Sequence, residues 1–231
     1  MDLDRLPAHI AMIMDGNGRF AQSQGFTRLW GHRKGYKTLR SVLMDSSELG
    51  IKFLTVYAFS AENWKRPKDE VDGLMELIER SMRDEIPTML RNNVRMRVTG
   101  RQSDLPDSLQ DAIRLATETT AQNTGITFVL AVNYGGRAEI VDACKSLVSE
   151  GLSADQITEE AIRSRMYTPE IPDPDLIVRT AGEMRWSNFL LYQGAYSELF
   201  VTDTTWPEFG LEQLLRAVKT FQTRRRKFGG L

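Results

Sequence analysis

Short apolar runs recur along the 231-residue chain, and most of them are rich in β-branched and aromatic side chains. Runs of this kind, bounded by glycine or polar positions, predict β-strands. Six segments fit the pattern: 10–14, 53–59, 94–98, 127–132, 175–178 and 199–202. The first carries no charge, which is typical of a strand buried on both faces of a parallel sheet.

Apolar positions at helical spacing alternate with these strands. They predict a helix over 32–49, where Gly50 provides a C-terminal stop, and another over 71–90, where Pro87 introduces a kink. Further helices are expected at 106–122, 138–150, 155–166 and 211–227. Residues 21–31 are expected to form a loop or a short helix. Strands that alternate with helices predict an α/β fold with a central parallel six-stranded sheet flanked by helices.

Composition restricts the possible partners and compartments. Lys and Arg number 30 against 31 Asp and Glu, so the net charge of −1 gives no global field to hold nucleic acid. The one cysteine, Cys144, excludes an internal disulfide, and its apolar neighbours predict a buried side chain. No apolar run approaches the ~20 residues that span a bilayer, and the acidic start is unlike a signal peptide. We expect one cytoplasmic domain, 1–231, without a transmembrane segment.

The first strand leads into the turn Asp15-Gly16-Asn17-Gly18-Arg19. The glycines free the backbone to bring its N–H groups close to an anion, and the arginine adds a fork of donors suited to phosphate. A carboxylate beside a phosphate repels it unless a divalent cation lies between them, and Mg²⁺ often bridges the two. The turn therefore predicts a phosphate site at which Asp15 holds Mg²⁺.

The stretch from Gly16 to Ala21 also satisfies the loose dinucleotide fingerprint G-x-G-x-x-A. A dinucleotide site needs an acidic residue roughly 20 positions later, at the end of the next strand. The strand 53–59 is followed by Ser60 instead. A nucleotide-dependent oxidoreductase is therefore disfavoured.

A second basic group follows the fifth strand, where Arg179 and Arg185 are joined by a glycine-containing turn and followed by Ser187. The polar loop 60–67 follows the second strand. Because carboxyl ends of parallel strands meet at one edge of a sheet, these segments should share a crevice with Asp15. Two basic sites and one metal carboxylate fit two diphosphates, with Mg²⁺ on one of them.

Basic residues also continue along the segment between the first two strands. They are Arg19, Arg28, Arg33, Lys34, Lys37 and Arg40. Such a run is usually a solvated helix face.

Five motifs in order carry a resemblance that extends over essentially the whole chain. They are Asp15-Gly16-Asn17-Gly18-Arg19, Gly31-His32-x-x-Gly35, Phe59-Ser60-x-Glu62-Asn63-Trp64-x-Arg66-Pro67, Arg179-Thr180-x-Gly182-Glu183-x-Arg185-x-Ser187-Asn188-Phe189 and Glu198-Leu199. The sequence thus resembles the cis-prenyltransferases, specifically the bacterial undecaprenyl diphosphate synthase family. The resemblance implies a homodimer that condenses isopentenyl diphosphate with an allylic diphosphate such as farnesyl diphosphate, forming a cis-polyprenyl diphosphate. The expected product is undecaprenyl diphosphate. The alternatives are a short-chain cis-prenyl diphosphate synthase and a non-catalytic partner subunit of the same fold.

The resemblance also implies roles for the positions that match the motifs. Asp15 and Asn63 are catalytic, and Asp15 binds Mg²⁺, while Glu198 reaches across the dimer towards the partner's metal site. The allylic diphosphate is held by Gly16, Asn17, Gly18, Arg19, Phe20, Arg28 and His32. Isopentenyl diphosphate is held by Arg66, Arg179, Arg185 and Ser187. A mobile loop that closes over the substrates contains Ser60, Glu62, Asn63 and Trp64.

Three uncharged positions depart from the family pattern. Phe20 stands where tryptophan is usual, Ala181 where serine or glycine is usual, and Trp186 where leucine or isoleucine is usual. They leave the reaction class intact but put substrate preference and tunnel length in doubt. If the product is short, Phe20 and Trp186 are the first candidates for what stops the chain. The helices over 32–49 and 71–90 are expected to line a hydrophobic tunnel for the growing prenyl chain. Because the product is hydrophobic, we also expect the enzyme to contact a membrane peripherally when it releases that product.

Overall fold

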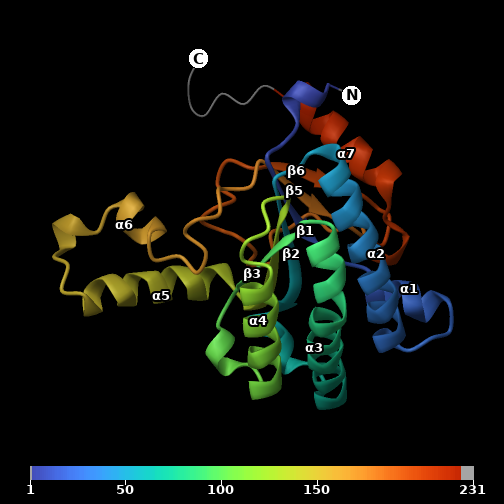
Figure 1. Ribbon diagram of the computed structural model, residues 1–231, viewed down its shortest axis with the longest axis horizontal. Coiled ribbons are helices and arrows are strands. Elements are labelled where there is room, and N and C mark those ends of the chain that lie inside the picture. The colour runs from blue at the N-terminus through green and yellow to red at the C-terminus, as the bar shows by residue number, and fades with distance from the viewer. Residues whose placement is uncertain (1, 225–231) are drawn as a thin grey trace.

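The computed structural model describes residues 2–224 and contains a six-stranded, all-parallel sheet (Figure 1). The strand order across the sheet is β3-β4-β2-β1-β5-β6. The strands are β1 (His9–Ile13), β2 (Phe53–Ser60), β3 (Arg95–Thr99), β4 (Thr127–Tyr134), β5 (Leu176–Arg179) and β6 (Glu198–Val201). All six predicted strands are confirmed, and so is the single α/β domain architecture.

Seven α-helices connect or flank these strands within the described residues. They are α1 (Asn17–Ser23), α2 (Arg28–Leu49), α3 (Lys68–Arg91), α4 (Asp107–Thr119), α5 (Gly136–Ser149), α6 (Glu159–Arg163) and α7 (Leu211–Thr223). Short 3-10 helices are η1 (Leu3–Arg5), η2 (Ala61–Lys65), η3 (Gln102–Asp104), η4 (Ala154–Gln156) and η5 (Trp206–Glu208). None of the helices in residues 2–224 is long and apolar enough to cross a membrane.

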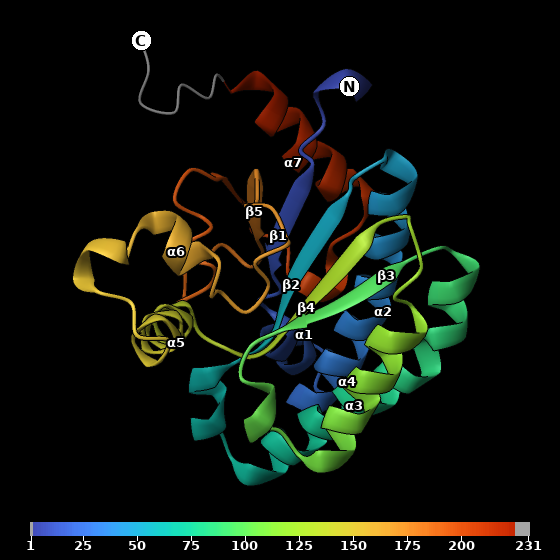
Figure 2. The same ribbon diagram turned by 60° about the vertical axis from the view of Figure 1, so that its left-hand side comes forward.

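The two faces of the sheet bury different side chains because successive strand residues point to opposite faces. Ile10 and Met12 of β1 join the larger core, which α2, α3, α4 and α7 complete on one side (Figure 2). Ala11 and Ile13 face a smaller cluster on the other side, which includes Phe189 from the loop before β6. β1 is therefore buried along its whole length, as its uncharged sequence predicts.

Several predicted boundaries are wrong, and local capping explains two of them. α2 starts at Arg28 rather than 32 because the Thr27 hydroxyl accepts a hydrogen bond from the backbone N–H of Trp30 at 3.3 Å. The predicted helix over 155–166 is replaced by η4 and the five-residue α6, because Thr158 interrupts it as a new N-cap.

Two further expectations need correction or fall partly outside the described chain. Cys144 is half-buried on α5 rather than fully buried, because α5 extends away from the sheet (Figure 1). The helix predicted over 211–227 ends at Thr223, and 225–227 lie outside the described residues.

Candidate active site

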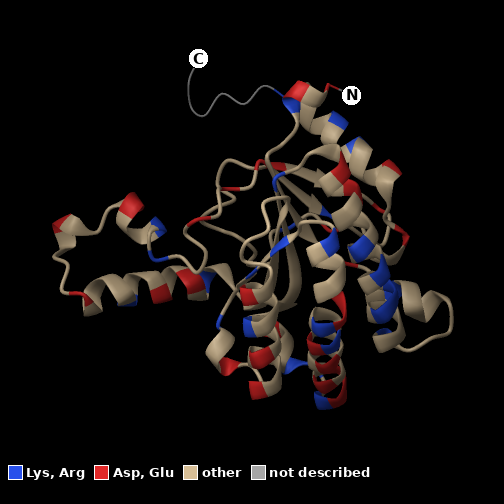
Figure 3. Ribbon diagram, viewed as in Figure 1, with Lys and Arg blue, Asp and Glu red and all other residues tan. Residues whose placement is uncertain are grey.

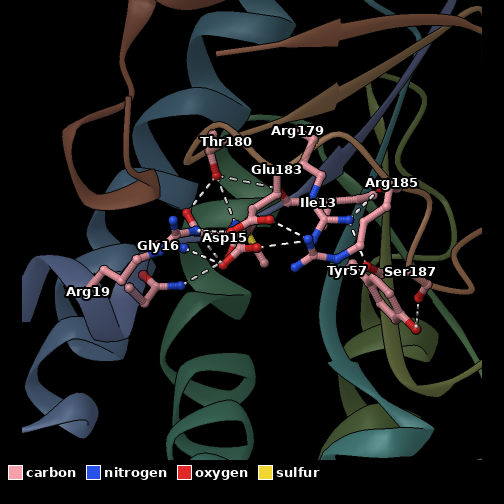
Figure 4. Close-up of polar contacts among 12 residues, drawn as sticks. Ile13, Asp15, Gly16, Arg19, Tyr57, Arg179, Thr180, Glu183, Arg185 and Ser187 are labelled. Atoms are coloured by element: carbon pink, nitrogen blue, oxygen red, sulfur yellow. Dashed lines mark hydrogen bonds and ion pairs between the residues drawn. The ribbon is translucent and has the colours of Figure 1, made fainter. Parts of the chain in front are cut away.

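The carboxyl ends of β1 and β5 bring the two predicted basic loops together. The strands are neighbours, with Ile13 opposite Arg179, so the turn after Ile13 lies beside the loop after Arg179. Figure 4 shows Asp15 at the centre of the polar contacts between these loops.

Asp15 is held by two arginines from different elements. Its Oδ2 lies 3.1 Å from Nη2 of Arg179, and its Oδ1 lies 3.5 Å from Nη2 of Arg19. The same Oδ1 accepts a hydrogen bond from the Gly16 backbone N–H at 2.7 Å. The Asp15 side chain is still 31% exposed, so one carboxylate is accessible between two fixed positive charges.

Thr180 fixes the backbone of Asp15, a role that was not assigned from the sequence. Its hydroxyl oxygen accepts a hydrogen bond from the Asp15 N–H at 2.8 Å and donates to the Asp15 carbonyl at 2.6 Å. The same carbonyl accepts from the Trp206 N–H at 2.9 Å. Thr180 lies in the motif that begins at Arg179, but only the pairing of β1 with β5 shows that it contacts Asp15.

Gly16 is required at the start of α1 for two reasons. Its φ of +99° lies in the region that side chains disfavour. A Cβ there would also lie 2.9 Å from the Cβ atoms of Ala181 and Thr205. Ala181, where the sequence departs from the family pattern, occupies a left-handed conformation itself, with φ of +65°.

Arg179 is buried and organises the second loop. Its side chain is 3% exposed, and Nη1 donates to the Ser187 hydroxyl at 2.7 Å and to the Arg185 carbonyl. Its Nε is buried without a hydrogen-bond partner among the described residues. Glu183 pairs with Arg185 and lies 3.2 Å from Arg19, so it joins the two basic loops. The sequence motif contains Glu183 but does not indicate this bridging role.

A second cluster surrounds Glu70 of α3, which was not predicted. Its carboxylate lies 2.9 Å from Nη1 of Arg66 and 3.3 Å from Nε of Arg28. The structure thus brings Arg66, assigned to isopentenyl diphosphate, together with Arg28, assigned to the allylic diphosphate. Burial and the charges of Arg66 and Arg28 lower the pKa of His32 to about 4, so the ring is neutral at pH 7. Its Nε2 is buried without a partner among the described residues.

The predicted loop after β2 forms the 3-10 helix η2. Its first turn is closed by Asn63, whose amide oxygen accepts from the Ser60 N–H at 3.1 Å. Trp64 donates its indole N–H to Asn133 at 2.7 Å, and Glu62 accepts from Asn188 at 2.7 Å. The contact between Glu62 and Asn188 links η2 to the loop after β5. The mobility of the segment 60–64 and the catalytic role of Asn63 stay predictions.

A cavity of about 740 Å³ connects these polar groups with an apolar space between α2 and α3. Its polar wall contains Asp15, Asn17, His32, Ser60, Glu62, Asn63, Arg66, Arg179, Arg185, Ser187 and Asn188. Its apolar wall contains Leu39, Leu43, Leu74, Leu77, Ile78, Met82, Met96, Phe128 and Leu130. Between these apolar side chains, the Tyr36 hydroxyl donates to Glu85 at 2.5 Å and joins α2 to α3.

The remaining predicted residues occupy different positions around this centre. A Cβ on Gly18 would lie 3.0 Å from Cζ of Arg28, so the glycine permits that arginine to approach. Phe20 stacks on Trp30, with ring centroids 6.0 Å apart. Glu198 begins β6 at the level of Ile10, near the amino ends of the strands, whereas Asp15 follows the carboxyl end of β1. One chain alone therefore does not bring Glu198 to Asp15.

The donor set around Asp15 fits a magnesium ion that is bound together with a diphosphate. Among residues 2–224, no three His, Cys, Asp or Glu side chains converge as a metal cage. Mg²⁺ usually takes one or two carboxylates, retains waters and uses substrate phosphates as further ligands. A single accessible carboxylate flanked by arginines satisfies this requirement.

The fold and its two basic loops define an α/β protein with a basic crevice at the carboxyl ends of β1 and β5. The comparisons with known proteins identify the family. The family model described as "Putative undecaprenyl diphosphate synthase" matches residues 13–229. The isoprenyl transferase of Fusobacterium nucleatum is 48% identical over 98% of this chain and 97% of its own. That of Thermotoga maritima is 46% identical over 98% of each chain.

Two solved structures agree with this result. Lavandulyl diphosphate synthase from Lavandula x intermedia, in complex with dimethylallyl diphosphate, superposes with a TM-score of 0.94 at 37% identity, over 98% of this chain and 99% of its own. A probable undecaprenyl diphosphate synthase from Campylobacter jejuni gives 0.82 at 34% identity, over 96% and 98%. The chain belongs to the undecaprenyl diphosphate synthase family, and it is a cis-prenyltransferase.

Proposed function

We propose that this enzyme condenses isopentenyl diphosphate with an allylic diphosphate, farnesyl diphosphate being the preferred candidate, and that it requires Mg²⁺. The observation that carries the proposal is the continuous cavity from the Asp15 and Arg179 groups to the apolar space between α2 and α3. A substrate with an anionic head and a hydrocarbon tail matches both parts of this cavity.

The chemistry assigns separate tasks to the two basic loops. The allylic C–O bond breaks with both electrons leaving on diphosphate, a new C–C bond joins the two substrates, and a proton leaves isopentenyl diphosphate. Mg²⁺, when held by Asp15, would neutralise negative charge on the allylic diphosphate. Arg19 and Arg28 add fixed positive charge there, and neutral His32 offers a hydrogen bond without further charge. Arg179, Arg185 and Ser187 orient isopentenyl diphosphate.

A homodimer completes the proposed site. Glu198 is 30% exposed at the start of edge strand β6 and lies far from Asp15 within one chain, so a second copy is needed for it to act at a metal. Val141 and Val148 of α5 are spaced seven residues apart on one helix face and are 49% and 64% exposed. Apolar side chains presented in this way favour a partner surface on the same side of the molecule as β6.

The product is proposed to be a cis-polyprenyl diphosphate, with undecaprenyl diphosphate as the family-based expectation. One observation favours the alternative of a shorter product: the Tyr36 and Glu85 pair lies between the apolar residues of the cavity. Along α2, Tyr36 follows Arg28 by eight residues, which corresponds to about 12 Å of helix.

The direct test is release of diphosphate from farnesyl and isopentenyl diphosphates by the purified chain, with and without Mg²⁺, followed by chromatography of the product. We expect release that EDTA abolishes and a product longer than the primer. No release at any Mg²⁺ concentration would favour the alternative of a non-catalytic partner subunit.

A further inference from the structure

Residues 16–44 carry six Lys and Arg side chains and no Asp or Glu, whereas the rest of the chain has 24 basic against 31 acidic residues. Figure 3 shows this basic region over α1 and the first half of α2. Arg19, Arg28 and Arg40 have carboxylate partners at 3.2 to 3.6 Å. The other three basic residues are exposed and form no ion pair with any described residue.

These three side chains share one face of α2 with an aromatic residue. Trp30, Arg33, Lys34 and Lys37 are spaced at i, i+3, i+4 and i+7, so they form a single row, here called the α2 stripe. Nζ of Lys34 lies 5.3 Å from the Trp30 ring centroid. The glycines that α2 packs against α1 are buried on another face of the helix.

The N-terminal end of the α2 stripe is extended by a stack of aromatic rings. Phe26 is 51% exposed and stacks on Trp30 with ring centroids 4.2 Å apart. Phe20 lies against Trp30 with centroids 6.0 Å apart and an interplanar angle of 8°. Phe26 belongs to neither of the two core clusters. Exposed aromatic rings beside basic side chains are typical of surfaces that dock at a membrane interface.

We propose that the α2 stripe and Phe26 dock this enzyme on the surface of an anionic lipid bilayer. Lys and Arg side chains lie along apolar surface while their charges reach lipid phosphates, and an adjacent aromatic ring enters the interface. The segment contains no carboxylate that would oppose this contact, although the whole chain is close to neutral. A bilayer fits better than a nucleic acid because the basic surface is one short row that ends in an exposed apolar ring.

Docking through the α2 stripe would also bring the substrate cavity close to the bilayer that receives a polyprenyl product. The same helix presents His32 and Tyr36 to the cavity, so one wall of the cavity would stand at the bilayer surface. This benefit rests on the proposed function, because it requires a polyprenyl product. Vesicle binding itself requires no substrate and is tested separately.

The experiment measures cosedimentation of the full chain with vesicles of phosphatidylcholine alone or mixed with phosphatidylglycerol, at physiological salt and without substrates. We expect binding only to the anionic vesicles and weaker binding as salt rises. The triple variant Arg33→Glu, Lys34→Glu, Lys37→Glu should lose at least about a hundredfold in partitioning, since each basic side chain contributes roughly fivefold at such a surface and the substitutions also add three negative charges.

Two further variants separate the stripe from general charge effects. Lys52→Glu, Arg114→Glu, Lys219→Glu changes the net charge equally at three exposed sites elsewhere and should bind nearly as wild type. Phe26→Ser should weaken binding at unchanged charge. Equal losses in the two triple variants, equal binding to neutral vesicles, or binding to single-stranded DNA but not to vesicles would overturn the proposal.

Discussion

Asp15 is the residue on which the two basic loops converge, and its contacts explain why its loss should affect chemistry more than folding. Arg179 and Arg19 approach its two oxygens, while Thr180 and Trp206 hold its backbone rather than its side chain. The backbone contacts survive substitution of the side chain. Asp15→Ala should therefore lower kcat at least about a hundredfold, as for loss of a group that stabilises transition-state charge.

The measurement pairs kcat with thermal unfolding, and Asp111→Ala, on the exposed face of α4, serves as the control carboxylate. A variant that keeps more than about a tenth of wild-type kcat, a barrier change under about 1.4 kcal/mol, would reject the metal assignment. Arg179 keeps its contacts with Ser187 and the Arg185 carbonyl in this variant, so a cooperative unfolding transition should remain.

The basic residues should separate the two substrates. Arg185→Ala should raise KM for isopentenyl diphosphate more than for the allylic substrate, because it removes charge-assisted hydrogen bonds from one site. Arg28→Ala should show the reverse. Arg185 tests the division better than Arg179, since Arg179 also contacts Asp15. Equal effects on both substrates in both variants would contradict the assignment of two sites.

The two histidines should make the fold sensitive to mild acid. Burial lowers the pKa of both His9 and His32 to about 4, from an ordinary value of 6.5. The unfolded chain therefore takes up protons first as the pH falls below 6.5, and stability conferred by the neutral rings is lost between pH 6.5 and 4.

Between pH 7 and 5.5, we expect the free energy of unfolding to fall by about 1 kcal/mol for each histidine, measured by urea denaturation. His32→Asn should remove about half of this pH dependence, while His9→Asn serves as the matched variant away from the substrate cavity. Unchanged pH dependence in both variants would show that the rings titrate normally.

At the scale of elements, α2 and α3 define the apolar part of the cavity and are joined by Tyr36 and Glu85. Phe20 and Trp186, the first candidates for limiting product length, do not line this cavity: Phe20 stacks on Trp30, and Trp186 packs beside the smaller core cluster. Tyr36 takes their place as the candidate because its side chain borders the apolar space itself.

Tyr36→Ala should lengthen the product by one or more isoprene units, since it removes both the ring and the hydrogen bond to Glu85. Tyr36→Phe keeps the bulk of the ring and should leave the product nearly unchanged. Chromatography of dephosphorylated products from matched incubations measures both variants. If the Ala variant gives the wild-type product at a normal rate, Tyr36 does not limit the chain.

At the scale of the whole molecule, α5 and α6 extend away from the sheet, and α5 exposes the apolar side chains of Val141 and Val148. Val148→Glu places a charge within this surface and should shift the protein from dimer to monomer in sedimentation equilibrium. Leu115→Glu, at a 44% exposed position on α4, is the matched control. Activity should fall together with dimer content if Glu198 acts on the partner's site, and a monomeric wild type would remove the basis for that role.

The sequence by itself determined the elements and the chemistry of the loops. Alternating apolar runs and helical periodicity predicted six strands in parallel, because side-chain burial in each element depends on local spacing. Asp15 and Arg179 were identified because each lies at the carboxyl end of a predicted strand. Within the described residues, local capping by Thr27 and Thr158 explains two boundary errors.

Only the tertiary structure decided which of these residues meet. The pairing of β1 with β5 places Thr180 on the Asp15 backbone, and the packing of α3 beside α2 gives Arg28 and Arg66 a shared carboxylate in Glu70. Tyr36 and Glu85 are likewise 49 residues apart in sequence. Such contacts depend on how distant elements pack together, and no local pattern in a single sequence encodes them.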